Sequence, residues 1–210
     1  MIFIGCNRME NKAPLIPMED FFRNPEKSSF RISPDGTHIA YMKPWKSRMN
    51  VYVVHIETDA EKRLTSSEER SIYGFLWLGD ERIGYVKDDG GNENMHFYAV
   101  NIDGTNEMDL TPFENIQARI IDDLEDDPNN VIIGLNKRNP QIHDPYRVNI
   151  NDGTMEMIAE NPGNISGWGT DHNGKLRIAT TSDGINTSLL YRDKESDEFK
   201  PILTTDFKVS

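Results

Sequence analysis

The amino-acid sequence predicts an all-β protein, and more narrowly a β-propeller of four-stranded blades with about four blades present. Three observations carry this prediction. Short runs rich in Val, Ile, Tyr and Phe alternate with clusters of Gly, Asn, Asp and Pro, a pattern typical of strands and turns. Helical periodicity is confined to one short stretch, PMEDFF at Pro17–Phe22. The strand-like runs also repeat at a nearly constant interval.

This interval can be measured at the Leu-Thr pair, or its equivalent, that closes each repeat. The closing apolar residues are Leu64, Leu110, Ile158 and Leu203, so the successive intervals are 46, 48 and 45 residues. A four-stranded propeller blade has about this length. A flat β-sandwich also has short strands and frequent turns, but it is not expected to keep so regular a period.

The repeats place four blades at about residues 28–66, 71–112, 117–161 and 165–205, within a propeller domain of residues 21–210. In the first blade we expect strands near Phe30–Ile32, His38–Met42, Asn50–His55 and Lys62–Leu64. In the second blade we expect them near Tyr73–Leu76, Arg82–Val86, Met95–Asn101 and Glu107–Leu110.

Local chemistry supports these assignments. The pairs Asp35-Gly36 and Asp103-Gly104 supply residues that tolerate a positive φ, which tight turns between strands require. Large rings on the predicted inner strands can fill the space between adjacent blades. These rings belong to Phe75, Trp77 and Trp168.

Four blades leave the closure of the ring open. The last residues, Thr205–Ser210, contain no obvious closing strand. An incomplete ring would expose the outer faces of the first and fourth blades, which favours aggregation. We therefore expect either a piece of a longer protein or self-association through the open propeller edges.

The N-terminal residues 1–20 are expected to form a leader or tether. Phe3-Ile4-Gly5-Cys6 resembles a bacterial lipobox, in which Cys6 would carry the lipid. The alternative is a disordered N-terminus with a free thiol. The apolar start is far shorter than the ~20 residues of a membrane span. Because Cys6 is the only cysteine, no internal disulfide can form.

The charge of the chain argues against two classes of partner. Lys and Arg number 23 and Asp and Glu 35, which gives a net charge of −12. Nucleic acids and anionic lipid surfaces reward clustered cations, so neither is an expected partner.

The sequence contains no recognisable catalytic residue, cofactor site or metal site. The stretch closest to a G-x-S-x-G motif, Gly163–Gly169, has Asn164 in place of the first glycine. The five histidines are spread singly, without the spacing of a zinc motif. Two oxygen-rich stretches, Asp122–Asp127 and Lys87–Asn94, raise the alternative of calcium binding, but a solvated face and a connection between strands explain them.

One paired-carboxylate hypothesis concerns Glu68 and Glu69, which lie between the first two blades. Two carboxylates at the inner rim of a propeller could hold the free ammonium of a peptide end. The alternative is an exposed connection between blades.

Beyond composition, several stretches carry a family resemblance. The S-P-D-G-x-x-I-A-Y turn, N-V-Y-V-x-x-I and the closing R-L-T resemble the propellers of the Tol-Pal system and of prolyl oligopeptidase-family serine peptidases. More particular stretches are IPMEDFFRNPEKSSFRISPDG, KDDGGNEN, DLTPF, NKRNP, AENPGNISGW and LLYRDKESDEF. Together, from about Leu15 to the end of the chain, these are similar to the N-terminal propeller of bacterial acylaminoacyl-peptidase or dipeptidyl-aminopeptidase-like members.

This resemblance implies a two-domain enzyme that needs no cofactor. In the family, a propeller caps an α/β-hydrolase domain with a Ser-Asp-His triad and filters peptide substrates by size. None of the triad residues can be placed in this sequence, so the chain alone is expected to hydrolyse nothing. The alternative is a stand-alone TolB-like propeller that mediates protein–protein interaction in the periplasm. We expect a periplasmic or cell-envelope protein, lipid-anchored if Cys6 is acylated, with a cytoplasmic location as the alternative.

Overall fold

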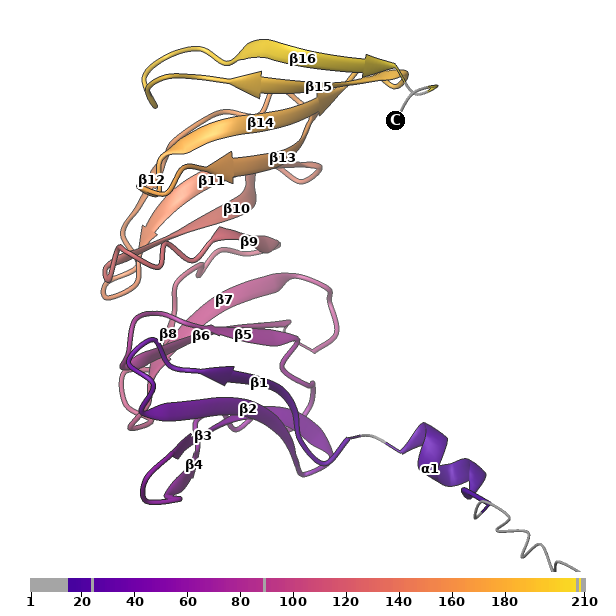
Figure 1. Ribbon diagram of the computed structural model, residues 1–210, viewed down its shortest axis with the longest axis vertical. Helices are drawn as coiled ribbons and strands as arrows, with labels where there is room; N and C mark the ends of the chain where they lie inside the picture. The colour runs from indigo at the N-terminus through magenta and orange to yellow at the C-terminus, as the bar shows by residue number, and fades with distance from the viewer. Residues whose placement is uncertain (1–14, 24, 89, 207, 209–210) are drawn as a thin grey trace, which may run out of the picture.

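A computed structural model describes residues 15–23, 25–88, 90–206 and 208. The predicted fold class is confirmed, because these residues form four four-stranded antiparallel sheets as in a partial propeller. Each sheet is a meander in which strands adjacent in the sequence pair with one another. The sheets follow one another in chain order from one end of the molecule to the other (Figure 1). None of the helices in the described part of the chain is long and apolar enough to cross a membrane.

The bounds of the strands are as follows. The first sheet contains β1 (Ser28–Ile32), β2 (His38–Trp45), β3 (Arg48–His55) and β4 (Glu61–Arg63). The second contains β5 (Gly74–Trp77), β6 (Arg82–Asp88), β7 (Met95–Asn101) and β8 (Met108–Asp109). The third contains β9 (Ala118–Asp122), β10 (Asn130–Asn139), β11 (Ile142–Asn149) and β12 (Met155–Met157). The fourth contains β13 (Ile165–Thr170), β14 (Leu176–Ser182), β15 (Asn186–Tyr191) and β16 (Lys200–Asp206).

One short helix, α1 (Met18–Phe22), precedes the sheets. It forms within the stretch whose periodicity predicted a helical turn. All of its residues are exposed, and it lies away from the sheets (Figure 1).

The repeated closing threonine has a clear structural role. In the first sheet, the Thr65 hydroxyl accepts a hydrogen bond from Val51 N at 2.9 Å, just beyond the end of β4. In the second sheet, the Thr111 hydroxyl accepts one from Phe97 N at the same distance. Each hydroxyl therefore satisfies a backbone donor that would otherwise be buried without a partner.

The predicted Asp-Gly turns have the expected backbone. Gly36 and Gly104 have φ values of +73° and +77°, in the region that glycine adopts without strain. Asp35 and Asp103 accept hydrogen bonds from the backbone N of Thr37 and Thr105. These side chains close the turns that join the strands.

Two hydrophobic clusters lie between neighbouring sheets. One joins the first and second sheets and contains Ala40, Met42, Val51, Val53, Leu64, Ile72, Phe75, Trp77, Ile83, Tyr85 and Val100. The other joins the second and third sheets and contains Leu76, Leu78, Phe97, Ala99, Leu110, Ile116, Ala118, Val131, Ile133, Leu135, Tyr146, Val148 and Ile150. The second sheet is therefore covered on both faces.

The outer face of the first sheet lacks such a cover. Phe75 and Trp77 of β5 are 5% and 9% exposed because they pack against the first sheet. Phe30 and Ile32 occupy the matching positions of β1 and are 59% and 64% exposed. The face that the second sheet buries against its neighbour is therefore exposed in the first sheet.

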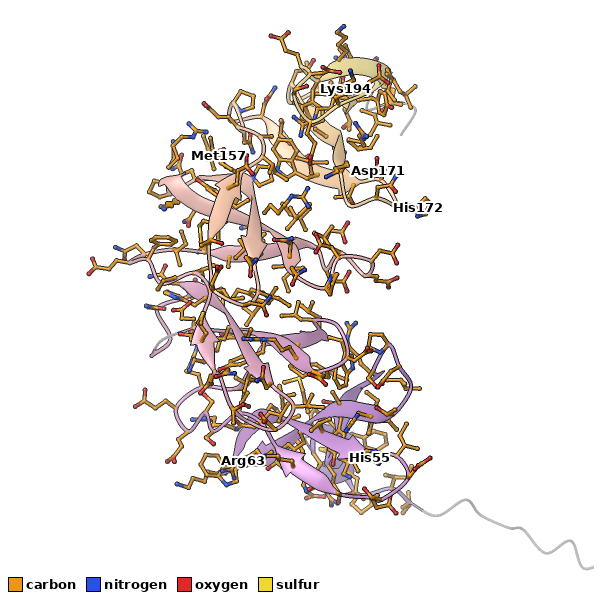
Figure 2. The ribbon with its side chains drawn as sticks, turned by 90° about the vertical axis from the view of Figure 1, so that its left-hand side faces the viewer. His55, Arg63, Met157, Asp171, His172 and Lys194 are labelled. Carbon is orange, nitrogen blue, oxygen red and sulfur yellow. The ribbon has the colours of Figure 1, made fainter. Side chains whose placement is uncertain are left out.

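The meander gives the molecule two distinct faces. The turns between the first and second strands, and between the third and fourth strands, of each sheet lie on one side, which we call the turn face. The turns between the second and third strands, and the links between sheets, lie on the other side, which we call the connector face. Figure 2 shows this division, with His55, Asp171 and His172 on one side and Arg63 and Met157 on the other.

Candidate functional site

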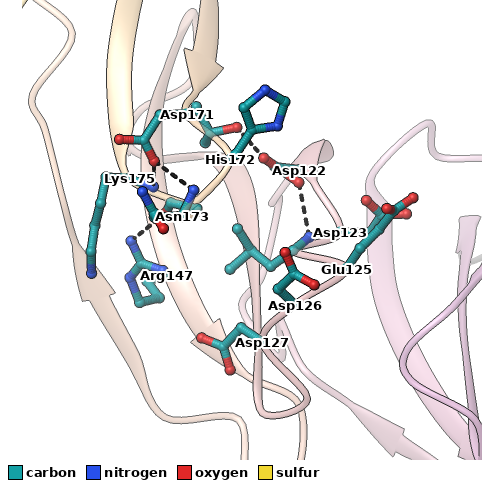
Figure 3. A pocket seen from close by; sticks show the side chains of 13 residues that line it. Asp122, Asp123, Glu125, Asp126, Asp127, Arg147, Asp171, His172, Asn173 and Lys175 are labelled. Carbon is teal, nitrogen blue, oxygen red and sulfur yellow. Dashed lines mark hydrogen bonds between the residues drawn. The ribbon is translucent and has the colours of Figure 1, made fainter.

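The most prominent cavity, about 600 Å³, opens on the turn face between the third and fourth sheets. Two segments form most of its wall (Figure 3). Residues 122–127 lead from β9 toward β10, and residues 170–175 join β13 to β14. Arg147 of β11 completes the lining.

Side-chain caps hold both segments in place. In the first segment, Asp122 Oδ1 accepts from Leu124 N at 2.8 Å, and Leu124 itself is buried. In the second, Asp171 Oδ1 accepts from the backbone N of Asn173 and Lys175, at 2.9 and 3.0 Å. Such aspartate turns hold a loop by pairing the side chain with backbone N–H groups two to four residues on.

The two segments also touch directly. A hydrogen bond joins the Thr170 hydroxyl to Asp122 Oδ2. A Cβ at Gly174 would lie 2.6 Å from Leu124 Cδ2, so a larger residue there would have to push the Leu124 side chain aside. Gly174 also has a φ of +65°, which glycine adopts without strain.

Several charges around the cavity are neutralised by partners within the fold. Asp171 Oδ2 accepts from Arg177 Nε at 2.8 Å, and this contact holds the pKa of Asp171 below its ordinary value. Arg147 Nη2 donates to Glu195 Oε1 at 3.1 Å and to the Gly174 carbonyl at 2.9 Å.

Other carboxylates remain available. Asp123, Glu125 and Asp126 make no side-chain hydrogen bond or ion pair with another described residue. They belong to one of the two segments that line the cavity, and His172 belongs to the other (Figure 3). Within the described ranges, no three His, Cys, Asp or Glu side chains converge as a metal-binding group. The cavity can therefore attract an ammonium or guanidinium group by its field.

Sequence reasoning located only part of this cavity. Asp122–Asp127 was interpreted as a solvated face, whereas the structure places it opposite the next blade. Arg147 and the 170–175 turn were missed, because they come from other strands and carry no spacing motif. The Asp-His-Asn-Gly turn at Asp171–Gly174 was the one available signal.

The predicted pair Glu68 and Glu69 lies on the connector face, between β4 and β5. Both residues are exposed. Glu68 Oε1 accepts from Lys46 Nζ at 2.8 Å, so one carboxylate already has a cationic partner. Glu69 makes no ion pair within the described ranges, and the binding of a peptide end by this pair stays a prediction. Cys6 lies outside the described residues, and its lipidation also stays a prediction.

The neighbouring Arg70 differs from these glutamates because its partner is buried. Arg70 Nε lies 3.4 Å from Oδ1 of Asp88, whose side chain is fully buried at the end of β6. This contact raises the pKa of Arg70. It ties the link between the first two sheets to the second sheet.

Comparison with known proteins identifies relatives among the peptidases. No protein-family model matches the chain. The chain is 29% identical to dipeptidyl aminopeptidase BIII of Pseudoxanthomonas mexicana over 170 residues, which cover 80% of the chain and 25% of that enzyme. This chain is a homologue of that peptidase. It is also 25% identical to dipeptidyl peptidase family member 6 of Caenorhabditis elegans, over 88% of the chain and 26% of that protein. The predicted resemblance to peptidases is thus confirmed, and this homologue spans about a quarter of the length of its curated relatives.

Solved structures support the fold. The chain matches a prolyl endopeptidase with a TM-score of 0.62 and 10% identity, over 86% of the chain and 30% of the other protein. It matches TolB from Acinetobacter baumannii with a TM-score of 0.55 and 16% identity, over 85% and 44% of the two chains. At these identities the matches describe the shared propeller architecture.

Proposed function

We propose that this chain is part of the N-terminal propeller of a serine peptidase of the prolyl oligopeptidase family. In that protein it would narrow the path by which peptides reach an α/β-hydrolase domain encoded outside these 210 residues. The observation that carries the proposal is the similarity to dipeptidyl aminopeptidase BIII over 80% of the chain and only a quarter of that enzyme.

The proposal assigns no chemistry to the chain by itself. Hydrolysis would come from the serine nucleophile of the second domain. A fluorophosphonate probe should therefore leave the 210-residue chain unlabelled and should label the longer gene product. Labelling of the short chain at a defined serine would overturn the claim that it is not catalytic alone.

A gating role makes a second prediction, about the cavity lined by residues 122–127 and 170–175, which we call the acidic cavity. Its unpaired carboxylates would raise the local concentration of peptides with free amino groups. In the longer gene product, the triple change Asp123→Asn, Glu125→Gln, Asp126→Asn should lower kcat/KM for cationic peptides severalfold and should raise it for acidic peptides, which the carboxylates repel. The matched control is the triple change Glu57→Gln, Glu81→Gln, Glu156→Gln, at three exposed residues outside the cavity. Equal effects of the two triple variants would contradict guidance by this cavity.

The glutamate pair can be tested in the same protein. If Glu68 and Glu69 bind the peptide ammonium, Glu69→Gln should raise KM for substrates with a free amino end. N-acetylated substrates should be unaffected. Equal changes for both substrate types would argue that these residues only link two sheets.

A second candidate function is a stand-alone TolB-like propeller that works through protein contacts in the periplasm. The genomic sequence downstream of Ser210 discriminates between the candidates. Further blades followed by a G-x-S-x-G motif would favour the peptidase. An immediate stop codon would favour the binding protein.

The exposed outer face of the first sheet also bears on assembly. Phe30 and Ile32 would be covered either by a further blade or, in the isolated chain, by the fourth sheet of a second copy. Ile202 and Leu203 of that sheet are 59% and 57% exposed. Sedimentation of the isolated chain should show concentration-dependent association that Phe30→Ser with Ile32→Ser abolishes.

The proposed anchoring of the protein in the cell envelope depends on lipidation of Cys6. Mass spectrometry of the native N-terminus should find acylated Cys6 as the first residue. An unmodified Met1 on the mature protein would contradict lipidation.

A further inference from the structure

Two histidines of the first sheet, His38 and His55, meet across neighbouring strands. They are direct partners in the pairing of β2 with β3. The adjacent pair is hydrogen-bonded, because Ile56 N donates to the Thr37 carbonyl at 2.9 Å. His38 and His55 therefore occupy a non-hydrogen-bonded pair, in which side chains approach most closely. Their ring centroids are 4.8 Å apart with the planes nearly perpendicular.

The surroundings of His38 determine which of its ring nitrogens carries the proton. The Thr37 hydroxyl lies 2.7 Å from His38 Nδ1 and also donates to Asp35, at 2.9 and 2.8 Å from its two oxygens. Because Thr37 has one hydroxyl proton and Asp35 accepts it, His38 Nδ1 must be the donor to Thr37. The lone pair of His38 Nε2 is then free. A histidine that donates its other N–H to such a chain is typical of metal ligands.

His55 contributes an unsatisfied ring nitrogen. Its Nδ1 atom is buried and has no hydrogen-bond partner. A buried polar atom without a partner costs free energy, and a ligand that accepts the lone pair would relieve this cost. His55 lies on the turn face (Figure 2).

The fold itself does not require histidine at these positions. The corresponding first cross-strand pair is Arg82 with Asn101 in the second sheet. It is Asn130 with Asn149 in the third sheet. The two imidazoles are thus a feature of the first sheet that the repeated architecture leaves unexplained.

We propose that His38 and His55 form a two-histidine site for a borderline divalent cation such as Zn²⁺. Imidazole nitrogen is a preferred ligand of Zn²⁺, Ni²⁺ and Cu²⁺, whereas Mg²⁺ and Ca²⁺ prefer oxygen. Water fills the remaining positions, because no third histidine, cysteine or carboxylate joins this pair among the described residues. The cation links β2 to β3, and the net charge of −12 favours its approach.

This site departs from the expectation of no metal that the sequence produced. The two residues are separated by other strand residues, so neither their spacing nor a motif signals the pair. Only the register of β2 against β3 brings the imidazoles together.

The experiment is a titration of ZnCl₂ into the untagged chain at pH 7.5, followed by calorimetry and by the shift in Tm. We expect one site, a rise in Tm, and at least a tenfold loss of affinity in both His38→Ala and His55→Ala. MgCl₂ should produce no such shift. The matched control is His172→Ala, which removes an exposed histidine beside the acidic cavity and should bind Zn²⁺ like the unchanged chain.

Thr37 provides a test that does not depend on removing a ligand. Thr37→Val should weaken Zn²⁺ binding about 10–100-fold because it frees the His38 ring, and Thr37→Ser should restore binding. Circular dichroism should confirm that every variant folds. Absence of Zn²⁺ binding would overturn the proposal, as would unchanged binding in the His38→Ala, His55→Ala double variant. Loss of binding in His172→Ala alone would assign the ion to the acidic cavity instead.

Discussion

The boundaries between neighbouring sheets differ in kind along the molecule. The first two boundaries are apolar, since a hydrophobic cluster joins the first sheet to the second and another joins the second to the third. Neither cluster includes a residue of the fourth sheet. Fewer buried apolar residues lie in the third and fourth sheets outside these clusters, and ion pairs and hydrogen bonds join the two sheets, with Arg147 bonded to Glu195 and Arg192 bonded to the Ile158 carbonyl.

This difference indicates which sheets contribute most to the stability of the fold. Burial of a large apolar side chain contributes about 1.5–3 kcal/mol to folding. An exposed or half-exposed ion pair contributes about 0–1 kcal/mol. We therefore expect the first three sheets to unfold as one unit and the fourth to open more readily. The boundary between the third and fourth sheets also contains the cavity lined by residues 122–127 and 170–175.

The largest expected effect comes from breaking an apolar boundary. Phe97 is fully buried between the second and third sheets. Phe97→Ala should lower the free energy of unfolding by about 3–5 kcal/mol, through lost burial and the cavity that remains. Urea denaturation measures the change. Phe22→Ala is the control, since Phe22 is 81% exposed and its loss should change little. Similar effects of both changes would contradict the assignment of this core.

The next effect tests the threonine that closes the second sheet. Thr111→Val keeps the shape of the side chain but leaves the amide of Phe97 without its acceptor. The free energy of unfolding should fall by about 1–3 kcal/mol, the cost of an unsatisfied buried donor. Thr187→Val, at an exposed position of β15, should be nearly neutral. If Thr111→Val is also neutral, the repeated threonine has no role in stability.

A smaller effect is expected at the ion pair between the third and fourth sheets. Arg147 and Glu195 are partly buried, with side-chain exposures of 18% and 27%. A double-mutant cycle with Arg147→Gln and Glu195→Gln should give a coupling of about 1 kcal/mol that weakens in high salt. The more exposed pair of Lys46 and Glu68 should give a coupling near zero. A coupling of several kcal/mol at Arg147 would show that the fourth sheet is held as firmly as the others.

The smallest effect concerns the turn of the first sheet. Hydrogen bonds from Ser33 and Thr37 lower the pKa of Asp35 from 3.8 to about 2. Because the folded-state pKa is depressed, the ionised carboxylate stabilises the fold above about pH 4, and this contribution disappears as the pH falls toward 2. Asp35→Asn should therefore lower Tm slightly at pH 7 and not at pH 2. A constant difference in Tm across this range would contradict the pKa assignment.

The sequence predicted some strand ends well and missed others for a definable reason. We expected β2 to end at Met42 and β3 to begin at Asn50, but the strands extend to Trp45 and from Arg48. The turn between them consists of Lys46 and Ser47, both with positive φ, at 48° and 66°. Such turns usually contain Asn or Gly, so this sequence carried no signal of the longer hairpin.

The predicted positions of the aromatic residues were likewise right in one part of the chain and wrong in another. Phase and spacing placed Phe75 and Trp77 between blades, and both belong to the cluster shared by the first two sheets. Trp168 was expected to act in the same way at the fourth blade. It is half-buried and contacts Phe199, which directly precedes β16 of the same sheet, with ring centroids 5.7 Å apart. Which neighbour a ring meets depends on the twist between sheets, which no repeat in the sequence encodes.

The sequence by itself determined the all-β class, the four repeats and the relationship to peptidase propellers. These features are local, because alternation, turn residues and the closing threonine all recur within one blade length. Only the tertiary structure decided that residues 122–127 meet residues 170–175, that His38 faces His55, and that an ion pair joins the third sheet to the fourth. Such contacts depend on strand register and on the packing of one sheet against the next, and spacing along the chain specifies neither.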